Sequence, residues 1–178
     1  MTLKTMAVCL TLAALTAGHA ARAQQTEQVQ KPTTLKLGVF LPSNGNVKSA
    51  LGKTWLSLGA DYAFNKQGDA QRLMPLGYID YSFKSSHGLN ANYVGLGPAA
   101  RYYLSPPGTS SFSPYLGAGA GAYFLHASGL SNKTRVGFKV NAGLEINQSY
   151  LLEVNYTNPG SLQGVRLDGI NAQIGLRF

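Results

Sequence analysis

The chain has 178 residues, a formal net charge of +8 at pH 7 and one cysteine. This length is enough for one domain, and a single cysteine excludes both a disulfide framework and a cysteine-based metal site. Charged residues make up only 12% of the chain, whereas 21 glycines and 10 tyrosines favour β structure over a helical fold.

The amino-terminal segment has the features of a secretory signal peptide. Lys4 precedes an apolar run over residues 6–17, and small residues then offer cleavage after Ala20 or after Ala23. Cys9 lies inside the apolar run and would be removed with it. The predicted organisation is a signal peptide over 1–23, a polar lead-in over 24–34 and one domain over 35–178.

From residue 35 onward, apolar and polar residues alternate in short stretches that turn residues separate. Side chains of a β-strand point to opposite faces with period two, so each stretch predicts a strand with one apolar face. The predicted strands are 35–41, 56–64, 77–83, 94–104, 116–124, 136–146, 150–156 and 170–178. Pro98 lacks a backbone donor, which predicts a bulge or a local break in its strand.

The last predicted strand closes on Phe178, with Ile170, Ile174 and Leu176 on the same face and Arg177 on the other. Such a strand resembles the last strand of bacterial outer-membrane β-barrels, where the terminal aromatic residue belongs to the assembly signal. The resemblance implies an all-β fold, in which residues 35–178 form an eight-stranded antiparallel up-and-down transmembrane β-barrel and residues 24–34 a periplasmic lead-in. It also implies that the barrel-assembly machinery inserts this barrel. The predicted strands have about the length needed to cross a bilayer obliquely, ~9–11 residues.

Strand parity assigns the opposite face of each strand to the interior of this barrel. Eight of the inward positions are charged, four of them basic and four acidic: Lys36, Asp61, Asp80, Arg101, Lys139, Glu145, Glu153 and Arg177. An eight-stranded barrel is only wide enough for its interior to be filled by side chains, and a buried charge without a partner is costly. We therefore predict an internal ion-pair network and a plugged lumen rather than acid–base catalysis by paired carboxylates.

Parity also separates the glycines and aromatic residues of the two faces. Inward Gly117, Gly119 and Gly121 leave room for bulky inward side chains, for which the candidates are Trp55, Tyr93, Tyr103, Tyr115 and Tyr123. Outward aromatic residues near the strand ends predict girdles at the membrane interfaces: Tyr62, Phe64, Tyr81, Phe83, Tyr102, Phe124, Tyr150, Tyr156 and Phe178. The alternative for these rings is the core of a soluble β-sandwich.

With the amino end periplasmic, the connections after the first, third, fifth and seventh strands face outward. They carry six basic residues, Lys48, Lys53, Lys84, Lys133, Arg135 and Arg166, with Asp168 as the only nearby acid. A cationic rim of this kind can bind the phosphates of lipopolysaccharide, and ordinary solvated loop charge is the equal alternative. Nucleic acid is an unsuitable partner because the basic residues are dispersed and the protein is expected to be exported.

The segment from Asn155 to Gly160 is similar to the strand-seven region of the lipid A 3-O-deacylase family, which has a His-x-Ser-Asn arrangement there. In this chain Asn155 stands at the histidine position and Thr157 at the serine position. Asparagine cannot act as a general base near neutral pH, so the catalytic pair of that family is missing. His126 with Ser128 forms a second His-x-Ser at a predicted strand end, and His87 stands alone.

These features favour a non-catalytic, monomeric barrel in the outer membrane of a Gram-negative bacterium, with a structural or surface-interaction role. We expect no catalytic residue, no cofactor and no metal, and we expect outer-membrane lipid and lipopolysaccharide as partners. A lipid A-modifying enzyme with a divergent site and a narrow channel are the alternative functions.

Overall fold

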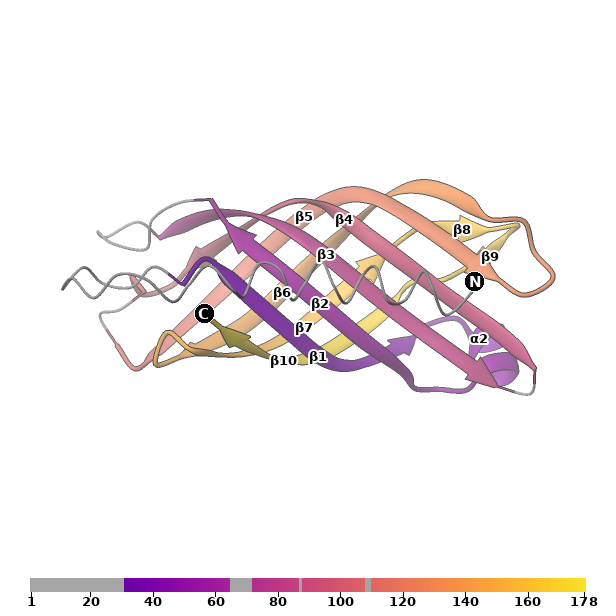
Figure 1. Ribbon diagram of the computed structural model, residues 1–178, viewed down its shortest axis with the longest axis horizontal. Coiled ribbons are helices and arrows are strands. Elements are labelled where there is room, and N and C mark those ends of the chain that lie inside the picture. The colour runs from indigo at the N-terminus through magenta and orange to yellow at the C-terminus, as the bar shows by residue number, and fades with distance from the viewer. Residues whose placement is uncertain (1–30, 65–71, 87, 108–109) are drawn as a thin grey trace.

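The computed structural model describes residues 31–64, 72–86, 88–107 and 110–178 (Figure 1). Eight antiparallel strands close into a barrel in the order β1-β10-β7-β6-β5-β4-β3-β2, which confirms the predicted fold class. The barrel strands are β1 Thr33–Pro42, β2 Trp55–Ala63, β3 Leu73–Ser86, β4 Leu89–Tyr103, β5 Phe112–Ala127, β6 Lys133–Ile146, β7 Tyr150–Asn158 and β10 Gly169–Arg177. The predicted signal peptide, residues 24–30 of the lead-in, the 65–69 turn and His87 lie outside the described residues.

The first and last barrel strands pair with each other and close the sheet. Leu37 lies opposite Ile174 in this seam, and Thr33 and Phe178 exchange backbone hydrogen bonds of 3.1 and 2.9 Å at its end. Because the number of strands is even, the start of β1 and the end of β10 lie at the same end of the barrel, and α2, β8 and β9 lie at the other (Figure 1). The role of Phe178 as an assembly signal stays a prediction.

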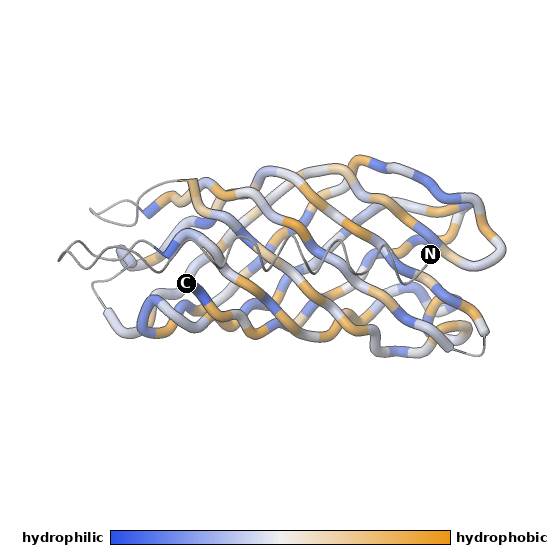
Figure 2. Tube along the Cα trace, viewed as in Figure 1, coloured by the Kyte–Doolittle hydropathy of each residue, from blue (hydrophilic) through white to orange (hydrophobic). Residues whose placement is uncertain are grey.

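The outward surface of the barrel is apolar. Hydrophobic and hydrophilic residues alternate along the strands (Figure 2), and outward side chains such as Leu37 and Ile174 are 51% and 61% exposed. A soluble β-sandwich would bury such residues between two sheets, so that alternative is wrong. The predicted girdle aromatics lie on this outward face. Among the described residues, no helix is both long and apolar enough to cross a membrane.

Strands β3, β4, β5 and β6 begin four, five, four and three residues earlier than the alternation predicts, and β1 starts two residues early. The predicted turn over 84–88 is in fact a continuation of the β3–β4 hairpin, in which Lys84 pairs with Ala91 and Ser86 with Leu89. Pro75 also lies inside β3, opposite Ala100. The hairpin continues beyond the apolar belt, where no apolar face is required, and its polar residues therefore resemble a turn in the sequence.

Pro98 produces a break rather than a bulge. The β4–β5 ladder stops between the pairs Leu96 with Ala122 and Ala99 with Gly119, and the register on both sides of the gap is the same. The missing N–H of proline interrupts the pairing without adding a residue to the strand.

Two small elements at the end that is predicted to face outward, called here the outer end, were not predicted from the sequence. Helix α2, Gly45–Leu51, starts at Asn44, whose side chain accepts hydrogen bonds from the N–H groups of Asn46 and Val47. Strands β8, Ser161–Leu162, and β9, Val165–Arg166, form a short hairpin within the connection after β7. Both elements are short, and each is held by contacts with the barrel rather than by a long apolar pattern of its own.

These two elements close the outer mouth of the barrel with an apolar cluster, called here the outer plug. It comprises Phe40, Val47, Leu51, Trp55, Ala91, Tyr93, Tyr123, Leu125, Leu162 and Leu167. A second cluster fills the opposite end: Ala63, Met74, Leu76, Tyr78, Tyr103, Tyr115 and Leu151. The polar interior therefore lies between two apolar layers.

The outer plug leads to a test of how far the loops support the barrel. Leu162 is completely buried in it, so Leu162→Ala should remove about 2–5 kcal/mol of stability. The matched control is Leu152→Ala, because Leu152 lies on the outward face with 46% of its surface exposed. We expect the temperature at which the folded gel band disappears to fall for Leu162→Ala only. Equal shifts for the two variants would contradict the plug.

Candidate functional site

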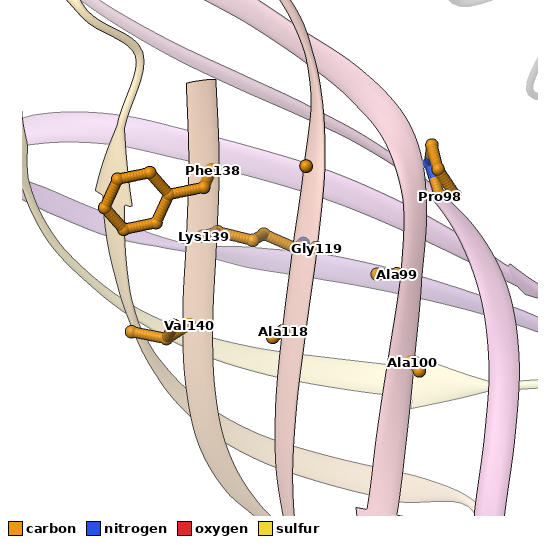
Figure 3. Close-up of a pocket in the computed structure, with 9 residues that line it drawn as sticks. Pro98, Ala99, Ala100, Ala118, Gly119, Phe138, Lys139 and Val140 are labelled. Carbon is orange, nitrogen blue, oxygen red and sulfur yellow. The ribbon is translucent and has the colours of Figure 1, made fainter. Parts of the chain in front are cut away.

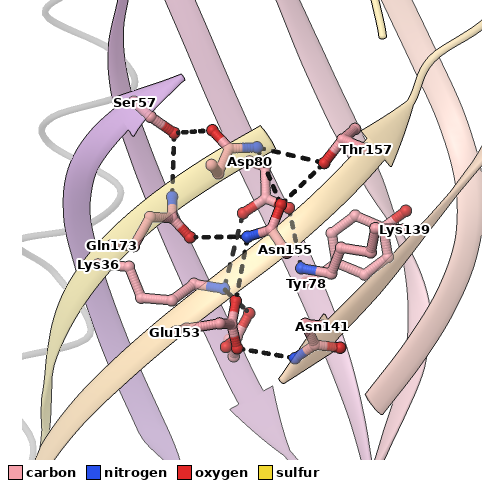
Figure 4. A network of polar contacts seen from close by, with 12 residues as sticks. Lys36, Ser57, Tyr78, Asp80, Lys139, Asn141, Glu153, Asn155, Thr157 and Gln173 are labelled. Atoms are coloured by element: carbon pink, nitrogen blue, oxygen red, sulfur yellow. Dashed lines mark hydrogen bonds and ion pairs between the residues drawn. The ribbon is translucent and has the colours of Figure 1, made fainter. Parts of the chain in front are cut away.

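Lys36 lies at the centre of the charged interior (Figure 4). Its ammonium nitrogen is 3.0 Å from Asp61 Oδ1, 3.2 Å from Glu153 Oε1 and 3.7 Å from Asp80 Oδ1. These residues come from β1, β2, β3 and β7, so the ion pairs connect strands across the lumen. Each of the four side chains is almost completely buried.

Two further cations complete this group. Arg101 forms ion pairs with Asp61 and with Glu153, the second at 3.3 Å. Lys139 is 2.9 Å from Asp80 Oδ2, and its ammonium lies 4.0 Å from the centre of the Tyr78 ring. The group thus contains three cations and three carboxylates, and its net charge is zero.

The remaining two charged residues of the interior form a separate pair near the end of the barrel where β1 starts and β10 ends. Arg177 Nη1 is 2.7 Å from Glu145 Oε2, which also accepts a 2.7 Å hydrogen bond from the Tyr103 hydroxyl. Arg177 Nε donates to the carbonyl oxygen of Lys31 at 2.7 Å. The eight inward charges therefore fall into two groups, a division that strand parity alone does not reveal.

A layer of neutral polar side chains lies beside the charges, and the sequence analysis did not identify it. Asn155 Oδ1 accepts hydrogen bonds of 2.9 Å from both Asn171 and Thr157. Gln173 Nε2 donates to Ser57 Oγ at 3.0 Å (Figure 4). The sequence did contain a signal for this layer, because these polar residues all occupy inward positions of the strands β2, β7 and β10.

The inward glycines accommodate different side chains from those expected. Tyr78 occupies the space beside Gly119 and Gly121, where an added Cβ would lie 3.1 and 2.9 Å from its ring and hydroxyl. Tyr123 instead packs against Gly95 and Gly137. All five predicted bulky residues are buried, but the glycine run on β5 makes room for a tyrosine of β3 that was not among them.

The segment that resembles the deacylase family lies on the inner face of the barrel. Asn155 and Thr157 are 1% and 0% exposed and are hydrogen-bonded to each other, so neither faces the lipid. At the outer rim, His126 Nδ1 lies 2.6 Å from Asn132 Oδ1, while Ser128 Oγ accepts a hydrogen bond from the backbone of Asn90. In the described part of the chain, no group of three or more His, Cys, Asp or Glu side chains could hold a metal.

A shallow pocket lies on the wall formed by β4, β5 and β6 (Figure 3). It is lined by Pro98, Ala99, Ala100, Ala118, Gly119, Ala120, Phe138, Lys139 and Val140. Lys139 is the only ionisable residue among them, and its ammonium is bound to Asp80 in the lumen. The pocket is therefore an apolar depression with small side chains, beside the ladder gap at Pro98.

The six basic residues of the outer connections are not brought into one patch. Lys48 and Lys53 flank the end of α2, and Lys84 lies on β3 against Gly52. The other three, Lys133, Arg135 and Arg166, lie on β6 and β9. Asp168 is the only described acid at this end; it forms a 3.0 Å ion pair with Arg166 and accepts a 2.9 Å hydrogen bond from the Tyr156 hydroxyl.

The charged interior leads to a prediction about stability. Lys36→Met leaves three carboxylates with two cations, and loss of one member of a buried ion pair costs about 3–5 kcal/mol. We expect urea unfolding, followed by the fluorescence of Trp55, to shift to lower concentration. Lys36→Met with Asp61→Asn should recover part of the loss, and the exposed control Lys53→Met should unfold like the wild type. No shift for Lys36→Met would show that the group does not stabilise the barrel.

Several solved structures of outer-membrane barrels have the same fold. Neisserial surface protein A is 16% identical, with 82% of this chain and 96% of that chain covered, at a TM-score of 0.56. The outer membrane enzyme PagL is 15% identical, with 82% and 98% covered, at a TM-score of 0.54. The N-terminal β-barrel domain of Pseudomonas aeruginosa OprF is 13% identical, with 84% and 98% covered, at a TM-score of 0.53. At these identities the likeness shows the fold alone.

A search of curated proteins gives no match to the sequence. The family model for the outer membrane protein beta-barrel domain matches residues 10–178, which include every strand described above. The match, the closed barrel and its apolar outer surface agree with one another. The chain belongs to the outer membrane protein β-barrel domain family.

Proposed function

We propose that this protein is a closed, monomeric and non-catalytic barrel of the Gram-negative outer membrane, exported with a cleaved signal peptide, whose basic outer end binds the phosphates of lipopolysaccharide. The observation that carries the proposal is the separation of charge along the barrel. In the lumen, four cations are balanced by four carboxylates. The six cations of the outer end face one acid, Asp168, which is already paired.

The positions of these cations suit an anionic lipid surface. Lys53, Arg135 and Arg166 are exposed, while Lys48 and Lys84 are half-buried. Solvated phosphates are attracted by such a local excess of positive charge, and Arg can bind them through two parallel hydrogen bonds. Four of the five acids in the described chain lie in the lumen, so the cations at the outer end lack the mixed acidic neighbours that ordinary solvated loop charge would have.

The filled interior supports a barrel without a channel. The outer plug and the second apolar cluster close the two ends of the barrel. The charged side chains of the lumen form ion pairs with one another and leave no open path for ions among the described residues. The buried Asn155 and Thr157 support a non-catalytic role, because the deacylase-like segment has neither the base nor access to lipid.

The lipopolysaccharide contact is tested with a variant that neutralises four cations, Lys53→Gln, Lys84→Gln, Arg135→Gln and Arg166→Gln. We expect its affinity for lipopolysaccharide, measured with the purified barrel in detergent, to be at least tenfold weaker at low salt. Wild-type binding should weaken with added salt and with dephosphorylated lipopolysaccharide. The control Arg72→Gln removes a cation from the opposite end and should bind like the wild type. Unchanged binding by the fourfold variant would overturn the proposal.

The non-catalytic and closed character is tested with two measurements on the unmodified protein. Lipid A from cells with and without expression should have identical mass spectra, and planar-bilayer recordings should contain no conductance steps. Loss of one acyl chain from lipid A would favour the deacylase alternative. Stable steps in the recordings would favour the narrow channel.

A further inference from the structure

The six basic residues of the outer end form two separate clusters. The β3 cluster consists of Lys48, Lys53 and Lys84 around Gly52. The Gly52 N–H donates to the Lys48 carbonyl at 2.9 Å, Lys53 follows it in the chain, and a Cβ built on it would lie 3.5 Å from Lys84 Cε. These contacts bring the backbone of Lys48 and Lys53 and the side chain of Lys84 together beside β2 and β3.

The β6 cluster consists of Lys133, Arg135 and Arg166. Lys133 and Arg135 are two residues apart on β6, and the Arg135 side chain passes along Gly160 and donates to the Ser161 carbonyl at 3.4 Å. Ser161 is in turn the ladder partner of Arg166 in the β8–β9 hairpin. The hairpin thus brings Arg166 to the junction of β6 and β7.

The strand order places the two clusters on opposite sides of the barrel. From the β2–β3 junction to the β6–β7 junction there are four strands in either direction, β3 to β6 one way and β2, β1, β10 and β7 the other. At about 4.8 Å per strand, the clusters are roughly 20 Å apart along the wall. No Lys or Arg occurs in the segments that form the outer ends between the two clusters, which are residues 88–96, 120–132, 37–47 and 167–173.

Each cluster follows a pair of outward aromatic rings along its strand, towards the end of the barrel that carries α2, β8 and β9. Tyr81 and Phe83 stack at 5.4 Å on β3, immediately before Lys84. Phe138 of β6 and Tyr156 of β7 are 6.3 Å apart, and Phe138 lies three residues after Arg135 on the same strand. Aromatic rings of membrane barrels lie at the membrane–water interface, so both clusters are at the depth of the lipid phosphates.

We propose that each cluster binds the phosphates of a separate lipid A molecule, so that one barrel holds two lipopolysaccharides on opposite sides. This inference rests on the proposed function. The rings contact the upper acyl chains while the cations bind the phosphates above them. In the β6 cluster, Asp168 holds Arg166 through Nε, and the side chain of Arg166 remains 60% exposed for a phosphate.

The experiment counts lipids by native mass spectrometry of the full barrel in detergent, with bisphosphorylated lipid A as the probe. We expect the wild type to bind two lipids. Lys53→Gln with Lys84→Gln should lower the doubly bound species at least tenfold and leave one lipid, and so should Arg135→Gln with Arg166→Gln. The combined fourfold variant should hold none, and the control Arg72→Gln should hold two.

A gel-mobility shift on heating verifies that each variant is folded. Since Arg166 also pairs with Asp168, Lys133→Gln with Arg135→Gln provides a second test of the β6 cluster that leaves this pair intact. The two-site inference would be overturned, while the proposed function stands, if the wild type bound only one lipid. The same conclusion would follow if either double variant lost both lipids together. A wild type that binds none, or that binds dephosphorylated lipid A equally well, would overturn both.

Discussion

The ion-pair group around Lys36 is the interaction on which the rest of the structure depends. In a membrane, every strand must satisfy its backbone within the sheet, and every inward charge must find its partner inside a narrow barrel. Lys36 meets this requirement with carboxylates of three other strands, Asp61, Asp80 and Glu153. Removal of any partner leaves a charge that water cannot reach, so the ion pairs fix both the filling of the lumen and the relative positions of the strands.

A filled lumen restricts where this barrel can act. Its two apolar clusters separate the charged interior from both aqueous sides, so a partner has access to the loops and to the outward face. The outer plug contributes to both, because α2 and the β8–β9 hairpin close the mouth and at the same time carry or position Lys48, Lys53 and Arg166. Closure of the barrel and presentation of its cations are therefore properties of the same short elements.

The sequence predicted the structure well inside the membrane belt and less well outside it. Within the belt, the alternation of residues such as Ile170 to Arg177 predicted both the strands and the face of each side chain. Outside it, Lys84 to Ser86 continued a hairpin although they resemble a turn, and Gly45 to Leu51 formed a helix. Lipid on one side and packed side chains on the other impose a period of two, and this constraint ends where both faces meet water.

The sequence by itself determined the all-β barrel, the number of its strands and the inward position of each charged residue, because period-two alternation is local. Only the tertiary structure decided which charges meet. Asp61 and Glu153 are far apart in the chain, and their common contacts with Lys36 and Arg101 result from strand stagger and closure. The same closure placed Tyr78 beside Gly119 and divided the outer cations between two sides of the wall. Such contacts depend on the register of every strand around the ring, which no single stretch of sequence contains.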